Sequence, residues 1–275
     1  MPRVLYIATV HYKSPRWIDI QARQLREHLS VPYQTWTSLE GIPRSYSDRF
    51  DVVIEQHGEH AGKLNHLARE ICHVAADDDL IMFLDGDAFP ISDPMPVITA
   101  SLEQAPLVAV QRVENLREPQ PHPCFCVTTV GTWRRVRGDW SLGATWRTSV
   151  NTVISDVGAN LRRALELSDT PWVPVLRTNS TNLHPVFFGI YGDIVYHHGA
   201  GFRSQFVSRA DRARLRKGLA SESLARKLLR YGKDRLLGRS WEHDSNVRIG
   251  EQSESIFQAI ADGDPVWLTQ LQHTA

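Results

Sequence analysis

The chain has 275 residues, with 31 Lys and Arg and 31 Asp and Glu, so its formal net charge is zero. This length suits one large domain, or one domain with a small appendage, and the ordinary composition excludes fibrous, disordered and membrane-embedded classes. The balanced charge identifies no partner, and no nucleic-acid-binding motif accompanies it, so we expect no nucleic-acid partner.

The cysteines and the N-terminus indicate a reducing compartment. Cys72, Cys124 and Cys126 do not make a disulfide framework, and a zinc site at Cys124 and Cys126 would need two more ligands nearby. Buried free thiols are the expectation. The apolar run at residues 3–10 is too short to span a membrane and lacks a signal-peptide cleavage site. We therefore expect a cytoplasmic location.

Alternating strands and helices are predicted over the first third of the chain. The strands are at residues 4–10, 33–36, 52–54 and 80–84, and helices follow Ser14-Pro15 and Gly62. This alternation predicts an α/β fold in which helices flank a mostly parallel sheet.

The remainder continues with short strands and ends in helices. Strands are predicted at residues 107–113, 124–130, 172–176, 186–190 and 194–198, and helices at residues 94–104 and from Asp156 onward. Two short helices, split at Gly263-Asp264-Pro265, are expected within residues 253–271. We divide the chain into a domain at residues 1–203 and a basic helical C-terminal extension at residues 204–275.

The most informative stretch is the apolar run at residues 80–84, which stops at Asp85-Gly86-Asp87. Ligands of open α/β sheets lie beyond the carboxyl ends of the strands. Two acids at such a strand end can hold a hard divalent cation, and the cation can hold phosphate oxygens. The alternative is a pair of solvated loop acids.

This pattern resembles the Asp-x-Asp motif of nucleotide-sugar glycosyltransferases of the GT-A type. The resemblance spans roughly residues 3–203 and implies a GT-A (Rossmann-like) catalytic domain at residues 1–203. It implies Mn²⁺ or Mg²⁺ bound by Asp85 and Asp87. The implied donor is a nucleoside-diphosphate sugar, UDP- or GDP-linked ahead of dTDP-linked. The implied acceptor is the hydroxyl of a glycan, a lipid-linked sugar or a small glycoside.

A second signal is the histidine pair His197-His198. In several GT-A families a histidine completes the metal site in a His-x-x-Gly-x-x-Lys setting. His198 and Gly201 match its first part, whereas Ser204 stands in place of the lysine and Arg203 is the nearest cation. The resemblance implies His198, ahead of His197, as the third ligand, and Arg203 beside the diphosphate. The alternative is a core histidine pair.

The nucleotide is expected against the end of the first strand and the start of the helix after Gly62. The residues expected to contact it are Thr9, His11, Tyr12, Lys63, Asn65, Asp85, Gly86 and Arg203. A cation at a helix N-terminus is unfavourable for the helix alone, so Lys63 suggests a nearby anion. The alternative is a solvent-facing lysine.

An inverting transferase needs a carboxylate to take the acceptor proton. Asp156, at a predicted helix start, is the first candidate, Asp139 is the second, and Asp193 is the third. The alternative for Asp156 is an ordinary helix cap. A retaining reaction needs no such base. The tryptophans within residues 133–148 are either core residues or an acceptor platform.

Residues 203–239 contain twelve Lys or Arg and three Asp or Glu. A solvated basic face is the plain interpretation. The alternative is peripheral contact with the inner face of an anionic membrane, near a lipid-linked acceptor.

Three other classes fit the motif less well. Phosphatases of the haloacid dehalogenase type place Gly and then Thr or Val after the second acid, where this chain has Ala88-Phe89. Sugar-nucleotide nucleotidyltransferases carry a glycine-rich loop after the first strand, where this chain has His-Tyr-Lys-Ser-Pro. A non-enzymatic module that binds carbohydrate or nucleotide remains open, and metal-independent binding would favour it.

Overall fold

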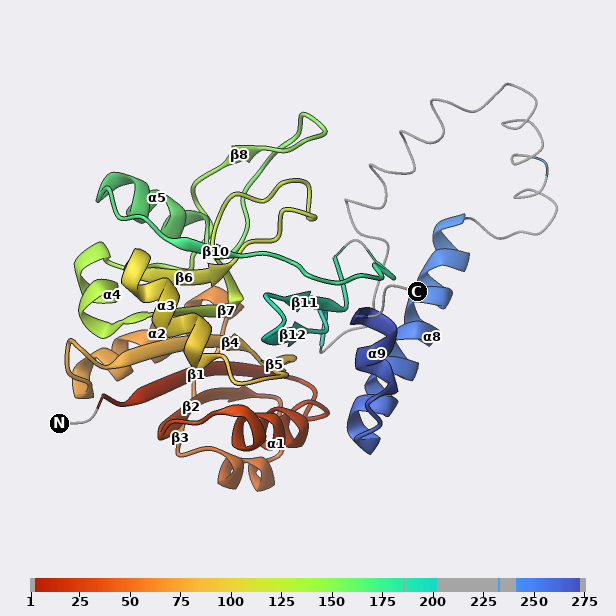
Figure 1. Ribbon diagram of the computed structural model, residues 1–275, viewed down its shortest axis with the longest axis horizontal. Helices are drawn as coiled ribbons and strands as arrows, with labels where there is room; N and C mark the ends of the chain where they lie inside the picture. The colour runs from red at the N-terminus through yellow and green to blue at the C-terminus, as the bar shows by residue number, and fades with distance from the viewer. Residues whose placement is uncertain (1–2, 185, 202–231, 233–240, 273–275) are drawn as a thin grey trace.

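The computed structural model describes residues 3–184, 186–201, 232 and 241–272 (Figure 1). It confirms the predicted fold class, because helices flank a seven-stranded sheet of order β10-β6-β7-β4-β1-β2-β3. All neighbours in this sheet are parallel except β7, which runs antiparallel to β4 and β6. The predictions at Arg203, Ser204 and the basic region 203–239 fall outside the described residues, apart from Gly232.

The strands of the large sheet are mostly buried, apolar runs. They are β1 (Leu5–Tyr12), β2 (Tyr33–Glu40), β3 (Val52–Ile54), β4 (Leu80–Asp85), β6 (Leu107–Val110), β7 (His122–Thr129) and β10 (Val173–Val175). β1 and β4 lie side by side at the centre, with Val10 beside Asp85. Their carboxyl ends therefore form one edge, as expected for parallel neighbours.

Helices cover the two faces of this sheet. They are α1 (Ile18–His28), α2 (His60–Val74), α3 (Met95–Gln104), α4 (Val130–Val136) and α5 (Ala159–Leu167), with a 3₁₀ turn at Arg44–Arg49. α2 packs Leu64, Leu67 and Ile71 against even-numbered residues of β1, whereas Leu25 of α1 packs against odd-numbered ones. The period-2 alternation of β1 thus divides the core into two clusters.

Two small sheets complete the described part. β5 (Ala88–Pro90) pairs with β12 (Val195–His197), which pairs with β11 (Gly189–Tyr191), all antiparallel. β8 (Trp146–Arg147) and β9 (Val153–Ile154) form a hairpin. The sequence analysis did not predict β5, because proline usually ends a strand. Pro90 is tolerated because β5 is an edge strand.

The C-terminal helices α8 (Trp241–Asp262) and α9 (Val266–Gln272) pack against this small sheet. Ile256, Ile260 and Trp267 share a hydrophobic cluster with Phe89 and Tyr196. The predicted split between the two helices is confirmed, although α8 is longer than expected. Among the described helices, none is long and apolar enough to cross a membrane.

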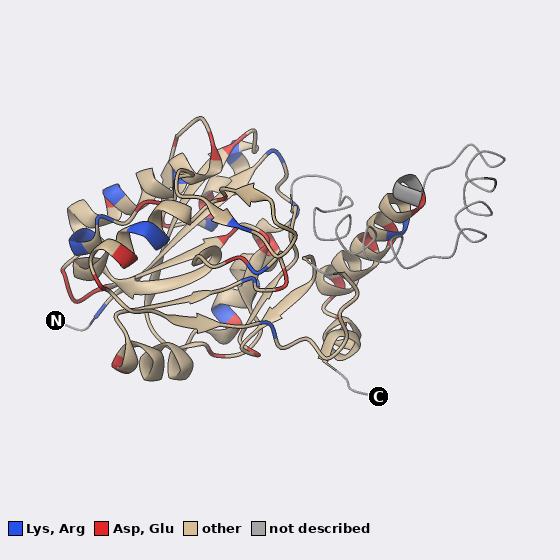
Figure 2. Cartoon of the chain, turned by 90° about the horizontal axis from the view of Figure 1, so that it is seen from above, with Lys and Arg blue, Asp and Glu red and all other residues tan. Residues whose placement is uncertain are grey.

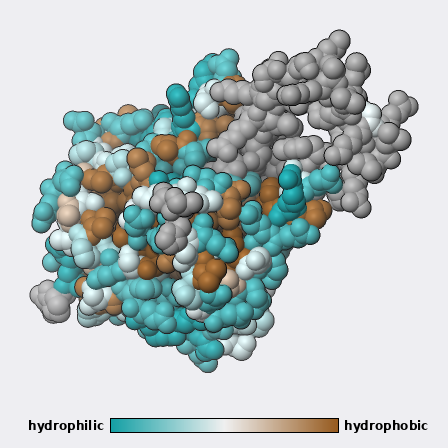
Figure 3. All heavy atoms as spheres, turned by 45° about the vertical axis from the view of Figure 1, so that its right-hand side comes forward, coloured by the Kyte–Doolittle hydropathy of each residue, from teal (hydrophilic) through white to brown (hydrophobic). Residues whose placement is uncertain are grey.

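The surface of the described part is mixed in character. Acidic and basic residues are interspersed over the helices and loops, and few lie on the strands of the large sheet (Figure 2). On the face shown in Figure 3, apolar residues reach the surface in several groups separated by hydrophilic ones. Neither view singles out one large patch of a single kind on the part of the chain that is described.

Candidate functional site

The turn from β4 to β5 holds Asp85, Gly86 and Asp87 at the carboxyl edge of the large sheet. A Cβ atom at Gly86 would lie 2.5 Å from the carbonyl oxygen of Val10, so only glycine fits this turn. From α1, the Gln21 side-chain amide donates hydrogen bonds to the carbonyl oxygens of Asp85 (2.8 Å) and Ala88 (2.7 Å). The sheet and α1 together fix the position of both carboxylates.

Asp85, Asp87 and His197 form one group, which we call the carboxylate trio. The pairing of β12 with β5 places His197 opposite Ala88 and so brings it to the Asp-Gly-Asp turn. His197 Nε2 lies 3.6 Å from Asp85 Oδ2 and 3.5 Å from Asp87 Oδ1. One ligand atom from each residue lies within 4.8 Å of the others.

The carboxylate trio fits a divalent cation. Among the described residues, Asp87 Oδ2 and His197 Nδ1 are buried without a hydrogen-bond partner. Unpartnered buried polar atoms are costly unless something else satisfies them. Burial acts to raise the pKa of the Asp87 carboxyl, but His197, His198 and hydrogen bonds to the carboxylate together outweigh burial, and the pKa falls to about 2. The trio therefore offers the ionised Asp87 carboxylate, the carboxyl group of Asp85 and an imidazole, a set that suits Mn²⁺.

The expected order of the two histidines is reversed in the structure. His198 Nδ1 is 2.9 Å from the Tyr196 hydroxyl, and His198 Nε2 is 2.8 Å from the hydroxyl of Ser253 in α8. The His198 ring also packs against Trp17, at 4.5 Å between ring centroids. Because both nitrogens have partners, His198 has no lone pair to offer to an ion at the aspartates. His198 has the satisfied core environment that was the alternative for this pair.

The carboxylate trio lies on the wall of a pocket with a volume of about 740 Å³. The predicted site residues that line this pocket are His11, Tyr12, Lys63, Asp85, Gly86, Asp87, Asp156 and His197. Those that are described but do not line it are Thr9, Asn65, Asp139, Asp193 and His198. Pockets of this size accept small ligands such as nucleotides.

Thr9 and His11 contact Gln21 of α1, the residue that holds the Asp-Gly-Asp turn. Thr9 is fully buried, and its hydroxyl donates to Gln21 Oε1 at 3.2 Å. His11 Nε2 lies 3.2 Å from the same oxygen, and burial lowers the pKa of His11 to about 4, so its ring is neutral. The odd-numbered positions of β1 face α1, which covers Thr9. The expected nucleotide contact of Thr9 is therefore wrong.

Tyr12 and Lys63 face each other across another wall of the pocket. Lys63 is 2% exposed, and its Nζ lies 2.5 Å from Glu40 Oε2 and 4.4 Å from the centre of the Tyr12 ring. Lys63 is therefore not the solvent-facing lysine of the alternative interpretation. The ion pair of Lys63 and Glu40 thus places one buried cation and one carboxylate beside the aromatic ring of Tyr12. This arrangement suits a polar, planar ligand.

Asn65 and Asp139 belong to a structural network rather than to the pocket. Asn65 Nδ2 donates to Asp139 Oδ1 at 2.6 Å, and the Trp140 amide donates to Asn65 Oδ1 at 2.8 Å. Asn160 Nδ2 donates to Asp139 Oδ2 at 2.9 Å. Burial acts to raise the pKa of Asp139, but hydrogen bonds from Ser141, Asn160 and Asn65 lower it below its ordinary value. The structure thus places Asn65 and Asp139 in this network, and neither lines the pocket.

We expect Asp139→Ala to destabilise the fold without changing ligand binding. The substitution leaves the Asn65, Asn160 and Ser141 donors without their acceptor, which costs about 1–3 kcal/mol in the free energy of unfolding. Urea denaturation measures this loss, and calorimetry with nucleoside diphosphate and Mn²⁺ checks binding. Unchanged stability together with lost binding would place Asp139 in the site after all.

Asp156 lines the pocket on a wall formed by the segment before α5. Its carboxylate is 44% exposed, and its Oδ2 lies 3.8 Å from an Arg112 guanidinium nitrogen. Arg112 is in turn paired with Glu118, which is fully buried and also accepts hydrogen bonds from Asn115 and Gln120. α5 begins at Ala159, after the Gly158 cap, so Asp156 is not its N-cap. An accessible carboxylate thus faces the pocket on a rigid support.

Sequence analysis missed two histidines of the pocket, His60 and His122. His60 Nε2 lies 3.0 Å from Asp85 Oδ1, and His122 Nδ1 lies 4.0 Å from Asp85 Oδ2. His60 begins α2, ahead of the helix that was predicted to follow Gly62, and His122 begins β7, two residues before the predicted strand at residues 124–130. Their residue type was the available signal, but neither histidine had a recognisable spacing to the aspartates.

We expect His60→Gln to weaken Mn²⁺ binding by about 10- to 100-fold, because groups that hold a metal-binding carboxylate contribute this much. The 3.0 Å contact with Asp85 fixes the orientation of that carboxylate. Titration followed by Mn²⁺ electron paramagnetic resonance measures the affinity. His73→Gln, at an exposed position near the end of the same helix, is the matched control. Equal affinities of the two variants would remove His60 from the site.

Gly201 covers the other side of Asp87. A Cβ atom at this position would lie 2.5 Å from Asp87 Cβ and 2.8 Å from Asp87 Oδ2. We expect Gly201→Ala to displace the carboxylate and lower Mn²⁺ affinity about tenfold or more. Gly250→Ala in α8, whose added methyl meets nothing within 4 Å, is the control. Retained affinity in the Gly201 variant would show that Asp87 does not hold the ion.

Comparison with known proteins gives matches to solved structures alone. No family model and no curated protein matches the sequence. TarS of S. aureus matches over 50% of this chain and 30% of its own length, at 10% identity and a TM-score of 0.38. The mannosyltransferase PcManGT from Pyrobaculum calidifontis, in complex with GDP-Man and Mn²⁺, matches over 50% of this chain and 47% of its own length. The identity is 14% and the TM-score is 0.38.

The galactosyltransferase LgtC, in complex with donor and acceptor sugar analogues, matches over 47% of this chain and 59% of its own length, at 11% identity and a TM-score of 0.33. The matched region spans less than two thirds of each of these three structures. LgtC and PcManGT are named as a galactosyltransferase and a mannosyltransferase. At this identity and overlap, no activity of this chain follows from them.

Proposed function

We propose that this protein is a metal-dependent glycosyltransferase that moves a sugar from a nucleoside-diphosphate sugar to an acceptor hydroxyl. One observation carries the proposal. Asp85, Asp87 and His197 converge on the wall of a pocket of about 740 Å³, and in the described part of the chain Asp87 and His197 each have one buried polar atom without a hydrogen-bond partner. The group stands at the carboxyl edge of the sheet, where an α/β fold binds its ligands.

The carboxylate trio would hold Mn²⁺ or Mg²⁺, and its imidazole favours Mn²⁺. When bound, such an ion neutralises the charge that develops on a departing diphosphate. The donor diphosphate would lie over the Asp-Gly-Asp turn. His60 holds Asp85 in position for this task, and Gly201 holds Asp87. The support of both carboxylates keeps the site preorganised before substrate arrives.

The nucleoside would lie against Tyr12 and the ion pair that buried Lys63 makes with half-buried Glu40. An aromatic ring stacks on a base, and Glu40 can accept hydrogen bonds from ribose or base donors. UDP- and GDP-linked sugars are the proposed donors, ahead of dTDP-linked ones. Arg203, which is outside the described residues, remains a proposed partner of the diphosphate.

Asp156 is the proposed general base. Its exposed carboxylate would take the acceptor hydroxyl proton while the hydroxyl oxygen bonds to the anomeric carbon. The bond from that carbon to the phosphate oxygen breaks, and its electron pair leaves with the diphosphate. The acceptor is proposed to be a glycan, a lipid-linked sugar or a small glycoside. Arg112 at 3.8 Å holds the Asp156 carboxylate in place.

In this proposal, residues 1–203 are the catalytic domain and residues 204–275 are a basic helical extension. The proposed location is the cytoplasm, with contact at the inner membrane face through residues 203–239 as a further possibility for lipid-linked acceptors. Binding to vesicles that contain anionic lipid measures that contact. Equal binding to neutral vesicles would remove it from the proposal.

The test of the reaction is a panel of UDP-, GDP- and dTDP-linked sugars with Mn²⁺ and with EDTA. The expected result is release of free nucleoside diphosphate, with Mn²⁺ and not with EDTA. Release of pyrophosphate from a nucleoside triphosphate and a sugar phosphate would identify a nucleotidyltransferase instead. Nucleotide binding that needs no metal and is accompanied by no turnover would identify a binding module.

A further inference from the structure

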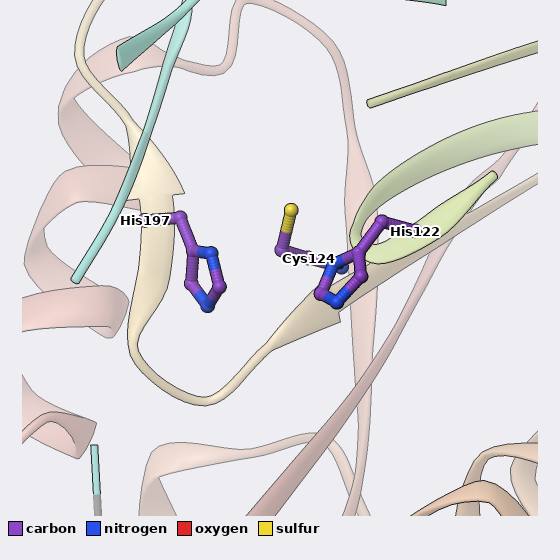
Figure 4. Close-up of side chains that lie close together, drawn as sticks. All are labelled: His122, Cys124 and His197. Atoms are coloured by element: carbon purple, nitrogen blue, oxygen red, sulfur yellow. The ribbon is translucent and has the colours of Figure 1, made fainter. Parts of the chain in front are cut away.

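A second group of metal-ligating side chains lies beside the carboxylate trio and shares only His197 with it. We call it the thiol site. It consists of His122 and Cys124 from β7 and His197 from β12 (Figure 4). All three are buried, and one ligand atom from each lies within 4.8 Å of the others. Figure 4 shows Cys124 between the two imidazole rings, whose centroids are 5.7 Å apart.

The topology supplies what the sequence lacked. In the sequence, His122 stands two residues before Cys124, but these two residues alone do not make a zinc site. β7 runs antiparallel to β4 with Cys126 opposite Phe83, so Cys124 and His122 lie towards the end of β4 where Asp85 stands. β12 then brings His197 to the same place through its pairing with β5. Two strands distant in the sequence thus complete the set.

The ring nitrogens of the two histidines differ in what now occupies them. His122 Nδ1 accepts a hydrogen bond from the Cys124 amide at 3.1 Å, so a cation bound at this nitrogen would replace that hydrogen bond. His197 Nδ1 is buried and, among the described residues, has no hydrogen-bond partner. Asp85 Oδ2 lies 4.0 Å from His122 Nδ1 and 3.6 Å from His197 Nε2, so it is available as a fourth ligand.

We propose that His122, Cys124 and His197 form a second cation site, which takes a thiophilic divalent ion such as Zn²⁺. One thiolate and two imidazoles are the nitrogen and sulfur ligands that zinc prefers, whereas Mg²⁺ and Mn²⁺ prefer oxygen. Binding releases the Cys124 thiol proton to solvent and leaves a thiolate on the metal. His122 and His197 line the pocket, so the ion enters by the same opening as a ligand.

The two sites share His197, so one ion excludes the other. Zn²⁺ in the thiol site takes His197 away from the carboxylate trio and competes with the other ion for Asp85 Oδ2. Zn²⁺ is therefore expected to displace Mn²⁺ from the protein. This second site does not rest on the glycosyltransferase proposal, because it follows from the positions of its own ligands.

Cobalt(II), a spectroscopic substitute for Zn²⁺, tests the thiol site directly. Titration of the wild-type protein is expected to give a thiolate-to-cobalt charge-transfer band in the near ultraviolet. The band is expected to persist in Cys126→Ser and to disappear in Cys124→Ser and Cys124→Ala. Cys126 is the matched control, because it is equally buried but packs in the other hydrophobic cluster, with α2. Absence of the band from the wild type would overturn the proposal, whatever the variants do.

Two further measurements separate this proposal from the transferase. Asp87→Asn is expected to keep the cobalt band, because Asp87 is not a ligand of the thiol site. Loss of the band in that variant would show that cobalt binding at Cys124 requires Asp87, which contradicts the proposal. In the wild type, Zn²⁺ is expected to release Mn²⁺, seen by electron paramagnetic resonance, at concentrations at least tenfold lower than in Cys124→Ser. Equal concentrations in the two proteins would also contradict it.

Discussion

Asp87→Asn is expected to abolish metal-dependent binding of UDP or GDP. Asp87 is 8% exposed, lies 3.5 Å from His197 Nε2, and has a buried oxygen with no described partner. The amide keeps the shape of the side chain but removes the charge that a divalent cation needs. Without the ion, two phosphate groups would face Asp85 across the turn with nothing to offset the repulsion. Isothermal titration calorimetry with Mn²⁺, and with EDTA in place of Mn²⁺, measures the difference.

Asp78→Asn is the matched control, because Asp78 is an exposed acid just before the other end of β4. This variant is expected to bind nucleoside diphosphate and Mn²⁺ as the wild type does. Thermal unfolding of both variants without ligand shows whether a loss of binding is a loss of fold. Wild-type binding by a folded Asp87→Asn protein would contradict the role of the aspartate.

Asp156→Asn is expected to lower the rate of sugar transfer by about 10²–10⁴-fold at saturating donor, which is the usual contribution of a general base. Asp156 lines the pocket through a carboxylate that is 44% exposed, so an acceptor hydroxyl can reach it. The asparagine cannot take the proton. Because the residue is not one of the metal ligands, the Kd for nucleoside diphosphate with Mn²⁺ is expected to remain unchanged.

The control for this experiment is Asp169→Asn, an exposed acid beyond the end of α5. Its backbone φ of 46° is one that asparagine tolerates. If Asp156→Asn transfers sugar at the same rate as this control, Asp156 is not the general base. The donor diphosphate would then take the acceptor proton, as in a reaction that retains configuration.

Local patterns were sufficient to predict most of the large sheet. β3 was predicted to the residue, and the alternation of strands and helices identified the fold class, because buried parallel strands are apolar runs with clear breaks. The Asp-Gly-Asp turn was placed correctly for the same reason. The short strand β5 was not predicted, since the preference of Pro90 for a break outweighed a pairing that depends on β12.

The distribution of roles within the site depended on contacts that the sequence does not contain. Which of His197 and His198 faces the aspartates is decided by the pairing of β12 with β5 and by Ser253, far along the chain. Thr9 was assigned to the pocket because it ends a strand, but α1 covers that face. Asp139 accepts hydrogen bonds from Asn65 and Asn160, which are far from it in the sequence. No spacing among these three residues predicts that they form a network.

The central claim is that Asp85, Asp87 and His197 together bind the ion that holds the donor diphosphate. Anomalous diffraction from crystals of the protein grown with Mn²⁺ and UDP or GDP tests it most directly. The account predicts one manganese peak within coordination distance of all three side chains and of the diphosphate oxygens. A nucleotide in the pocket with no manganese at these side chains would contradict it.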